Sequence, residues 1–259
     1  MSRTRSLLLF GLVLAFAGDP AAPAAAAQRL ADLAPAEAYR TCIQRARQSP
    51  GDGFEAAIAW RDEGGGAAAQ HCTAMALVNL GQFADAASRL ETLVAEMKDF
   101  SAGERAEVLS QAGRAWQRAG DPERARAAAT SAIRLAPERG DLYVDRGELL
   151  ATNGALWEAI DDFNAALERA PNDLDALIFR GAAYRLLETP ELARVDLEAA
   201  LARDTDNPDA LVELGAVELQ QGNRDTARQR WLRAISVAPA SPAADAARHW
   251  LETIDVKGR

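Results

Sequence analysis

The chain has 259 residues, 49% of them hydrophobic and only 6% aromatic, so it holds enough apolar material for a continuous core. Abundant alanine with few aromatic residues favours close-packed helices, because strands are richer in β-branched and aromatic side chains. The formal net charge of −9 argues against a general nucleic-acid binder, since contact with the phosphate backbone needs an excess of cations.

The N-terminal segment, residues 1–27, has the pattern of a cleaved secretory signal. Arg3 and Arg5 supply positive charge, an apolar run covers 7–17, and the alanines of 24–27 offer an A-x-A cleavage site. The alternative is an uncleaved anchor, but the run is much shorter than the roughly 20 residues of a spanning helix. We therefore expect no membrane span in the mature chain. Two lysines against 27 arginines suggest a GC-rich bacterium, so the exported protein is expected in the periplasm.

The segment at 28–66 is predicted to form a helical N-terminal region or a degenerate copy of the repeat that follows. It contains Cys42, and the other cysteine of the chain is Cys72. The even number and the predicted export favour a disulfide, with two buried free thiols or a redox pair as the alternatives. A disulfide between Cys42 and Cys72 would close a loop of about 31 residues, which stabilises a protein by roughly 3–4 kcal/mol in the chain-entropy description.

A period of 34 residues organises the rest of the chain. One column of the repeat holds glycine: Gly113, Gly147, Gly181 and Gly215. Alanine follows twelve residues later: Ala125, Ala159, Ala193 and Ala227. Proline follows the alanine by twelve more in three copies: Pro137, Pro171 and Pro239. A second glycine lies seven residues after the first in three copies, and Glu188 takes its place in the remaining one: Gly120, Gly154 and Gly222.

This pattern resembles the tetratricopeptide repeat, whose signature has small residues where two helices cross and proline at the end. The resemblance implies an all-α fold, a right-handed α-solenoid of stacked helix–turn–helix units that cannot bury their apolar faces alone. The units are predicted at 67–100, 106–139, 140–173, 174–207 and 208–241. A C-terminal capping helix is predicted within 242–259, where Trp250 and Leu251 are available to cover the last unit.

Residues that carry catalysis or bind metals are scarce. The two histidines, His71 and His249, lie in different regions, and no Cys/His cluster has metal-ligand spacing. A phosphate loop, a dinucleotide fingerprint and a nucleophile elbow are all missing from the sequence. We therefore predict a protein that is not an enzyme and needs no cofactor and no metal.

The adjacent carboxylates at 161–162 could be mistaken for a catalytic pair. However, Asp162 recurs one repeat later as Asp196, and each lies sixteen residues after an arginine, Arg146 or Arg180. The recurrence favours an internal ion pair between the two helices of a unit, which is a structural role.

In tetratricopeptide arrays the first helix of each unit, helix A, lines the concave surface. The face of helix A opposite the glycine column is therefore the predicted partner-binding groove, and its candidate residues are Arg114, Val144, Glu148, Ile178, Phe179, Arg185, Val212 and Leu219. Five of them would form an apolar strip bordered by charges. The alternative is that these apolar residues pack between neighbouring A helices and leave no usable patch.

One subfamily of these repeats holds a C-terminal carboxylate with a lysine and an asparagine at fixed groove positions. The lysine positions here hold Ser110, Val144, Ile178 and Val212. The asparagine positions hold Arg114, Glu148, Ala182 and Ala216. Because this clamp is missing, its ligand class is not implied for this chain.

The resemblance implies an exported scaffold that binds a polypeptide partner in the concave groove, in cell-envelope assembly or in a secretion or export complex. The alternative is a periplasmic module for a small ligand or glycan, which needs an enclosed pocket with converging polar and aromatic groups. If Phe179 anchors a peptide, Phe179→Ala should cost about 1–3 kcal/mol of affinity. If Phe179 is packed inside the solenoid, the same change should lower the melting temperature instead.

Overall fold

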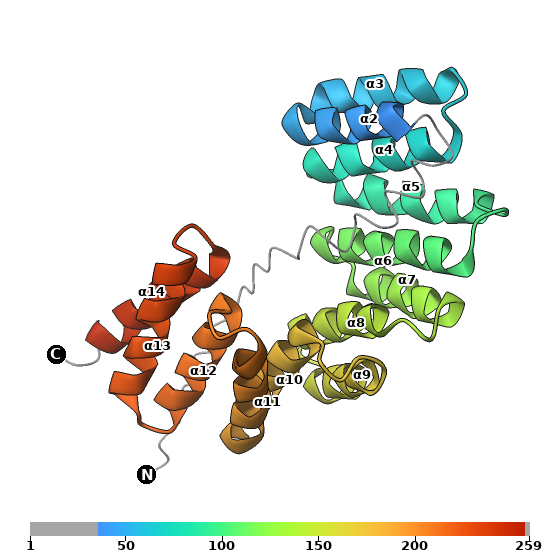
Figure 1. Cartoon of the computed structure of the whole chain (residues 1–259). Coiled ribbons are helices and arrows are strands. Elements are labelled where there is room, and N and C mark those ends of the chain that lie inside the picture. Colours follow the sequence, from blue (N-terminus) through green and yellow to red (C-terminus); the bar gives the residue numbers. More distant parts are fainter. Residues whose placement is uncertain (1–35, 257–259) are drawn as a thin grey trace, which may run out of the picture.

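The computed structural model describes residues 36–256, which form thirteen α-helices and no strand (Figure 1). The predicted all-α fold is therefore confirmed for this part, and the predicted signal peptide lies outside it. In chain order the helices are α2 (Ala36–Gln48), α3 (Pro50–Asp62), α4 (Gly66–Asn79), α5 (Phe83–Glu96), α6 (Ala102–Arg118), α7 (Pro122–Leu135), α8 (Gly140–Thr152), α9 (Leu156–Arg169), α10 (Leu174–Leu186), α11 (Pro190–Arg203), α12 (Pro208–Gln220), α13 (Arg224–Val237) and α14 (Pro242–Val256).

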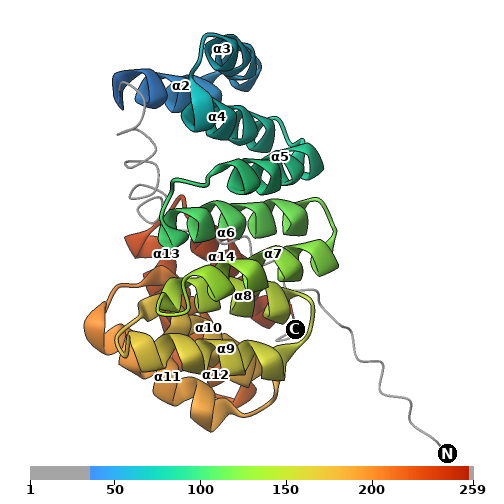
Figure 2. The ribbon, with the colours of Figure 1, turned by 90° about the vertical axis from the view of Figure 1, so that its right-hand side faces the viewer.

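Consecutive helices pair into hairpins, and the hairpins stack into a curved solenoid. Each of the five predicted 34-residue ranges contains one pair, from α4–α5 to α12–α13, and the pair α2–α3 precedes them. The first helices of the pairs, here called the A helices, lie toward the inside of the arc, and α7, α9 and α11 lie toward the outside (Figure 1). Figure 2 shows the same layers after a quarter turn, with α2 and α3 at one end of the stack.

A short insertion between the predicted units 67–100 and 106–139 lengthens one helix. Helix α6 begins at Ala102 and has 17 residues, against 13 for α8, α10 and α12. Its start is fixed by a capping box, in which Ser101 Oγ accepts from the Glu104 amide (3.2 Å) and Glu104 Oε2 accepts from the Ser101 amide (2.8 Å). The insertion is thus absorbed as about one extra helical turn.

The glycine column allows the two helices of a hairpin to approach closely. A Cβ atom on Gly147 would lie 2.5 Å from the Phe163 ring, and one on Gly215 would lie 2.4 Å from Trp231 Nε1. Real Cβ atoms essentially never come that near to another heavy atom. The crossing point of each of these units therefore tolerates only glycine, because a large side chain of the second helix fills the space.

The predicted ion pairs between helices are confirmed. Arg146 binds both carboxylate oxygens of Asp162 at 2.8 and 2.6 Å, and Arg180 binds Asp196 at the same two distances. Bidentate guanidinium–carboxylate pairs fix orientation as well as charge. The mostly buried carboxylate of Asp162 therefore has a structural role.

The turn between the paired helices uses the left-handed backbone region. Gly120, Gly154 and Gly222 have φ of 79°, 81° and 85° there, and Glu188, in the equivalent turn, has φ of 56°. Glycine adopts this conformation without a steric cost, whereas a side chain with a Cβ atom strains it. The repeat register thus locates a strained residue at Glu188.

Glu188→Gly should stabilise the protein by about 0.5–1 kcal/mol, because relief of the left-handed strain exceeds the added freedom of the unfolded chain. Urea unfolding followed by circular dichroism measures the change. The reverse substitution in the equivalent turn, Gly154→Glu, should destabilise by a similar amount. A Glu188→Gly protein less stable than the parent would contradict the expectation.

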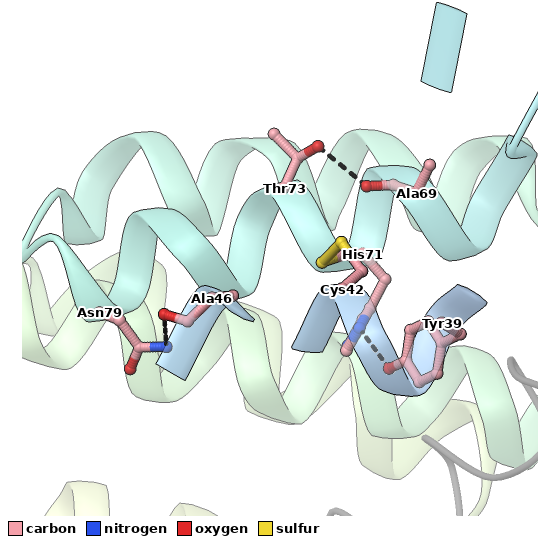
Figure 3. Close-up of a disulfide and its surroundings, with 8 residues drawn as sticks. Tyr39, Cys42, Ala46, Ala69, His71, Thr73 and Asn79 are labelled. Atoms are coloured by element: carbon pink, nitrogen blue, oxygen red, sulfur yellow. Dashed lines mark hydrogen bonds between the residues drawn. A yellow bond between two sulfur atoms is a disulfide. The ribbon is translucent and has the colours of Figure 1, made fainter. Parts of the chain in front are cut away.

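A disulfide joins the first two A helices (Figure 3). Cys42 of α2 and Cys72 of α4 are bonded, with their Cα atoms 6.2 Å apart. Beside them the Tyr39 hydroxyl donates to His71 Nδ1 at 2.9 Å. The sequence-based preference for a disulfide over two free thiols therefore agrees with the structure.

The C-terminal end is closed by α14. The Trp250 ring stacks on Trp231, with ring centroids 5.5 Å apart and planes 7° from parallel. Trp231 is fully buried, and its Nε1 donates to the Val212 carbonyl at 3.1 Å. Helix α14 thus covers the apolar face that the last hairpin would otherwise expose.

Candidate functional site: the inner face of the A helices

Polar side chains connect each A helix to the next along the inner face of the solenoid. His71 Nε2 of α4 donates to Gln111 Oε1 of α6 at 2.7 Å. Arg114 of α6 donates to both carboxylate oxygens of Asp145 of α8, at 2.8 and 2.9 Å. Arg185 of α10 donates from Nε to Glu213 of α12 at 2.7 Å. Hydrogen bonds and ion pairs between polar side chains therefore connect neighbouring A helices along the inner face.

The α6–α8 junction is the most highly charged part of this surface. Ser110 also donates to Asp145, and Arg139 Nη2 donates to Glu107 at 2.8 Å and to Asp141. Burial raises the pKa of Asp145, although Arg114 and the Ser110 hydroxyl act in the opposite direction. The arginines at this junction are therefore already engaged by carboxylates.

Carboxylates outnumber cations on the inner face. Four of them recur at 34-residue intervals: Glu107, Asp141, Asp175 and Asp209. Three more lie on the same helices: Asp145, Glu148 and Glu213. The arginines paired with this set are Arg114, Arg139 and Arg185. Aspartates in the first turns of α8, α10 and α12 also stabilise helix N-termini, which gives part of the column a structural role.

Glu148 is a carboxylate with little compensation. Burial, the charge of Asp145 and the charge of Asp175 raise its pKa to about 7, against a smaller opposing effect of Arg114. Within residues 36–256 its carboxylate makes no hydrogen bond or ion pair, and the Thr152 hydroxyl donates to its backbone carbonyl. Glu148 is therefore a partly buried anion that the protein itself does not neutralise.

Glu148→Gln should leave stability nearly unchanged near pH 4.5 and raise it by on the order of 1–3 kcal/mol at pH 8. The folded pKa of Glu148 lies above its ordinary value, so the wild-type protein loses stability as pH rises from about 4.5 through about 7. Urea unfolding of both proteins across this range measures the difference. Asp161→Asn, which removes an exposed charge on the outer helix α9, is the control and should show no such trend.

Arg185 presents a second unsatisfied group. The residue is only 5% exposed, and its Nη2 is buried without a hydrogen-bond partner in the described part of the chain. Its Nε is held by Glu213, while Gln220 donates to its carbonyl at 3.2 Å. Buried donors without an acceptor are rare in native proteins, and this one is enclosed, with almost no surface open to solvent.

The structure corrects the expected apolar strip. Val144, Ile178 and Val212 are only 7%, 3% and 5% exposed, because neighbouring A helices pack against them. Phe179 is partly buried, with its ring centroid 5.9 Å from that of Phe163, and Leu219 packs into the cluster around Trp231. The five residues therefore serve packing, and the side chains that connect neighbouring A helices there are polar.

Of the other three predicted groove residues, Arg114 and Glu148 are half-buried on α6 and α8, and Arg185 is buried in its ion pair with Glu213. Glu213 was not among the predicted site residues, although it shares the repeat position of Asp145. This register equivalence gave no signal for the pair, because the residue that corresponds to Arg114 relative to Glu213 is Ala182 and not Arg185. Its burial in an ion pair with Arg185 could not be read from the sequence.

A shallow recess of about 350 Å³ lies elsewhere, open to solvent between α3, α4 and α5. Its lining is Phe54, Leu77, Gln82, Asp85, Ser88, Arg89 and Thr92. It is not the enclosed pocket with converging aromatic groups that a small-ligand module needs. Among residues 36–256 no three side chains are grouped as metal ligands, and none of the helices is long and apolar enough to cross a membrane.

Stacked helical hairpins with a polar inner face define this protein as an α-solenoid of tandem repeats. Residues 110–173 and 182–245 match the family model described as tetratricopeptide repeat. These two stretches therefore carry tetratricopeptide repeats, as the spacing of the glycine, alanine and proline columns predicts.

Similar proteins share the repeat over different lengths. Over 124 residues the chain is 36% identical to the human protein described as FK506-binding protein-like, and 35% identical to its mouse counterpart. The match covers 45% of this chain and 36% of each relative, so the chain spans about a third of the length of these curated relatives.

Solved structures resemble a large part of the solenoid. The protein YrrB, described as a TPR protein with an unusual peptide-binding site, aligns with a TM-score of 0.51 and 20% identity over 75% of this chain and 96% of its own. TTC0263, a thermophilic TPR protein of Thermus thermophilus, aligns with a TM-score of 0.57 and 21% identity over 70% of this chain and 95% of its own. At these identities the likeness shows the fold alone.

Proposed function

We propose that this protein is a scaffold that binds a polypeptide segment along the inner face of α6, α8, α10 and α12. The observation that carries the proposal is the polar inner face, on which the half-buried Glu148 carboxylate makes no hydrogen bond or ion pair within the described residues. A polypeptide supplies main-chain and side-chain donors at regular intervals, so it can satisfy this carboxylate. Scaffolding through the concave surface is also what tetratricopeptide arrays generally do.

The proposal does not rest on the apolar strip predicted from the sequence, because its residues are packed. It follows that Phe179→Ala should lower the melting temperature, since its ring packs on Phe163. The peptide-binding site named for YrrB is consistent with the proposal, but at 20% identity it is a property of that protein. The polar groups of this chain carry the inference.

A photoreactive amino acid on each face of the solenoid tests the proposal. Leu186 follows Arg185 on α10 and is 41% exposed, whereas Trp157 on the outer helix α9 is 62% exposed. Peptides selected from a random twelve-residue library should cross-link to the probe at Leu186 and not to the probe at Trp157. Cross-linking at Trp157 alone would place binding on the outer face and overturn the proposal.

We further propose that the scaffold acts after export, in envelope assembly or in a secretion or export complex in the periplasm. The pattern of residues 1–27 supports the export, and a Cys42–Cys72 disulfide suits an oxidising compartment. N-terminal sequencing of the native protein should find Gln28 as its first residue. An intact Met1 on a cytosolic protein would contradict this part of the proposal and leave peptide binding untouched.

A further inference from the structure

We propose that His71 makes the contact between α2 and α4 sensitive to acid, and that the Cys42–Cys72 disulfide keeps this contact closed. When His71 takes up a proton, α2 is held less firmly on α4, and the hairpin α2–α3 can move away from the solenoid. The cross-link beside His71 opposes that movement. The device acts on the end unit of the stack and does not depend on the proposed peptide binding.

His71 is a buried histidine that bridges three A helices. It lies on α4 and is only 3% exposed. Its Nδ1 accepts a hydrogen bond from the Tyr39 hydroxyl of α2 at 2.9 Å, and its Nε2 donates to Gln111 Oε1 of α6 at 2.7 Å. Figure 3 shows the Tyr39 contact beside Cys42. Both ring nitrogens are thus used by the neutral imidazole, one as an acceptor and the other as a donor.

A proton added to His71 conflicts with the hydrogen bond from Tyr39. The proton would bind to Nδ1, which is the nitrogen that already accepts from the Tyr39 hydroxyl. Both partners would then carry a hydrogen, so the hydroxyl would have to turn its own hydrogen away. Tyr39 is only 2% exposed, and its hydroxyl makes no other hydrogen bond within the described residues. Protonation therefore leaves a buried donor without an acceptor, which destabilises the closed contact.

The positive charge of a protonated His71 would also lack a free counterion. Among residues 36–256, the charge that acts on His71 is that of Glu107 on α6, which is only 4% exposed. Glu107 already binds Arg139 at 2.8 Å, and Gln111 donates to it at 3.3 Å. Burial lowers the pKa of His71, while the hydrogen bond to Gln111 and the charge of Glu107 act in the opposite direction. Burial raises the pKa of Tyr39, the titratable group that faces the ring from α2, so Tyr39 stays neutral in acid.

Acid therefore weakens the contact between α2 and α4. Because the pKa of His71 is lowered in the closed form, the open form binds more protons once the pH falls below the ordinary value of 6.5. The contact has its full stability above this pH and loses stability in acid. Glu148 acts with the opposite sign, since its pKa is raised, and it lies on α8. A measurement confined to α2 and α3 separates the two groups.

The disulfide lies directly beside this contact. Cys72 follows His71 on α4, and Cys42 lies about one helical turn after Tyr39 on α2. The imidazole reaches solvent only when α2 moves away from α4, and the cross-link holds the two helices with their Cα atoms 6.2 Å apart at this turn. The cross-linked hairpin should therefore stay closed at a pH where the hairpin without the cross-link opens.

Hydrogen exchange of the full chain at pH 7.5 and at pH 5 tests the proposal, with each rate corrected for the intrinsic pH dependence of exchange. In the Cys42→Ala/Cys72→Ala protein, the protection factors of α2 and α3 should fall about tenfold between the two pH values. In the parent protein they should fall less than about threefold, because the cross-link keeps α2 over His71. Helices α10 to α13 are the internal reference, since repeat units contact only their neighbours.

Two histidine variants assign the effect to one ring. His71→Gln in the protein without the disulfide removes the titrating group and should abolish the pH dependence at α2, even if it lowers stability at every pH. His249→Gln, which removes the exposed histidine of α14, should leave the tenfold fall in place. A nuclear magnetic resonance titration of the parent protein is independent of these variants' stability. The imidazole signal of His71, assigned by its absence from His71→Gln, should titrate below pH 6.5.

The two parts of the proposal can fail separately. Equal protection of α2 at pH 7.5 and pH 5 in the protein without the disulfide would overturn the acid sensitivity, and so would a His71 signal that titrates at or above pH 6.5. A tenfold fall in the parent protein as well would overturn the role of the cross-link. Peptide cross-linking at Leu186 tests the scaffold and is decided independently of these results.

Discussion

Gly215→Ala is expected to destabilise the C-terminal repeats by about 2–3 kcal/mol, although alanine is the better helix former by about 1 kcal/mol. The added Cβ would lie 2.4 Å from Trp231 Nε1. Trp231 cannot move aside easily, because it is fully buried, donates to the Val212 carbonyl at 3.1 Å and stacks on Trp250. Urea unfolding followed by tryptophan fluorescence measures the loss.

The same substitution at two other glycines provides matched controls. At Gly113 the nearest atom to a new Cβ is the Ala125 carbonyl oxygen at 3.1 Å, and the facing side chain is the small Ala129, so Gly113→Ala should be close to neutral. At Gly103 in α6 no atom lies within 4 Å, and Gly103→Ala should stabilise by about 0.5–1 kcal/mol. Equal losses of unfolding stability in Gly113→Ala and Gly215→Ala would show that the facing side chain does not determine the destabilisation.

Removing the disulfide is expected to lower the stability of the N-terminal helices by about 3 kcal/mol, for a loop closed across 30 residues. In the Cys42→Ala/Cys72→Ala protein, α2 keeps the Tyr39–His71 hydrogen bond and the bond from Asn79 to the Ala46 carbonyl. These contacts are too few to hold the first hairpin as firmly, because the end unit of a solenoid has a neighbour on one side only. Hydrogen exchange of α2 and α3 should accelerate.

The distant repeats supply the internal control for this experiment. Repeat units contact only their neighbours, so exchange in α10 to α13 should be unchanged when the disulfide is lost. Peptide mapping without reductant should recover the Cys42–Cys72 cross-link from the parent protein. Two alkylatable thiols in freshly isolated protein would contradict both the bond and the expected loss of stability.

The register of the solenoid could be predicted from the sequence, because it depends on contacts inside a single unit. Gly147 faces Phe163, and Arg146 pairs with Asp162, both sixteen residues apart within one hairpin. Such contacts recur every 34 residues, and their period is visible without knowing how the units stack. The ion pairs and the fold class were predicted correctly for this reason.

The character of the inner face could not be predicted, because it depends on how closely successive A helices approach. Ala182 and Ala216 are buried on α10 and α12, and small side chains there let the helices come together. The β-branched residues one turn earlier, Ile178 and Val212, are then covered. A sequence period identifies the face of a helix that turns inward, but it does not give the distance between helices.

The hydrogen bond made by the Thr189 hydroxyl could not be predicted from the sequence either. Thr189 precedes Pro190 at the start of α11, a position that suits an N-cap. Its hydroxyl instead donates to the Tyr184 carbonyl at 2.8 Å, at the end of the preceding helix. The neighbouring Glu188 has its strained left-handed φ in the same turn.

The pairing of each glycine with a side chain of its own hairpin limits how the chain can change length. In each hairpin a glycine faces the side chain sixteen residues later, as Gly147 faces Phe163 and Gly215 faces Trp231. Recombination that joins two repeats at equivalent positions keeps this pairing. A crossover out of register would set a bulky residue against a bulky residue. Whole units can therefore be duplicated or lost in steps of 34 residues without breaking this pairing, and the short insertion that lengthens α6 lies between two hairpins.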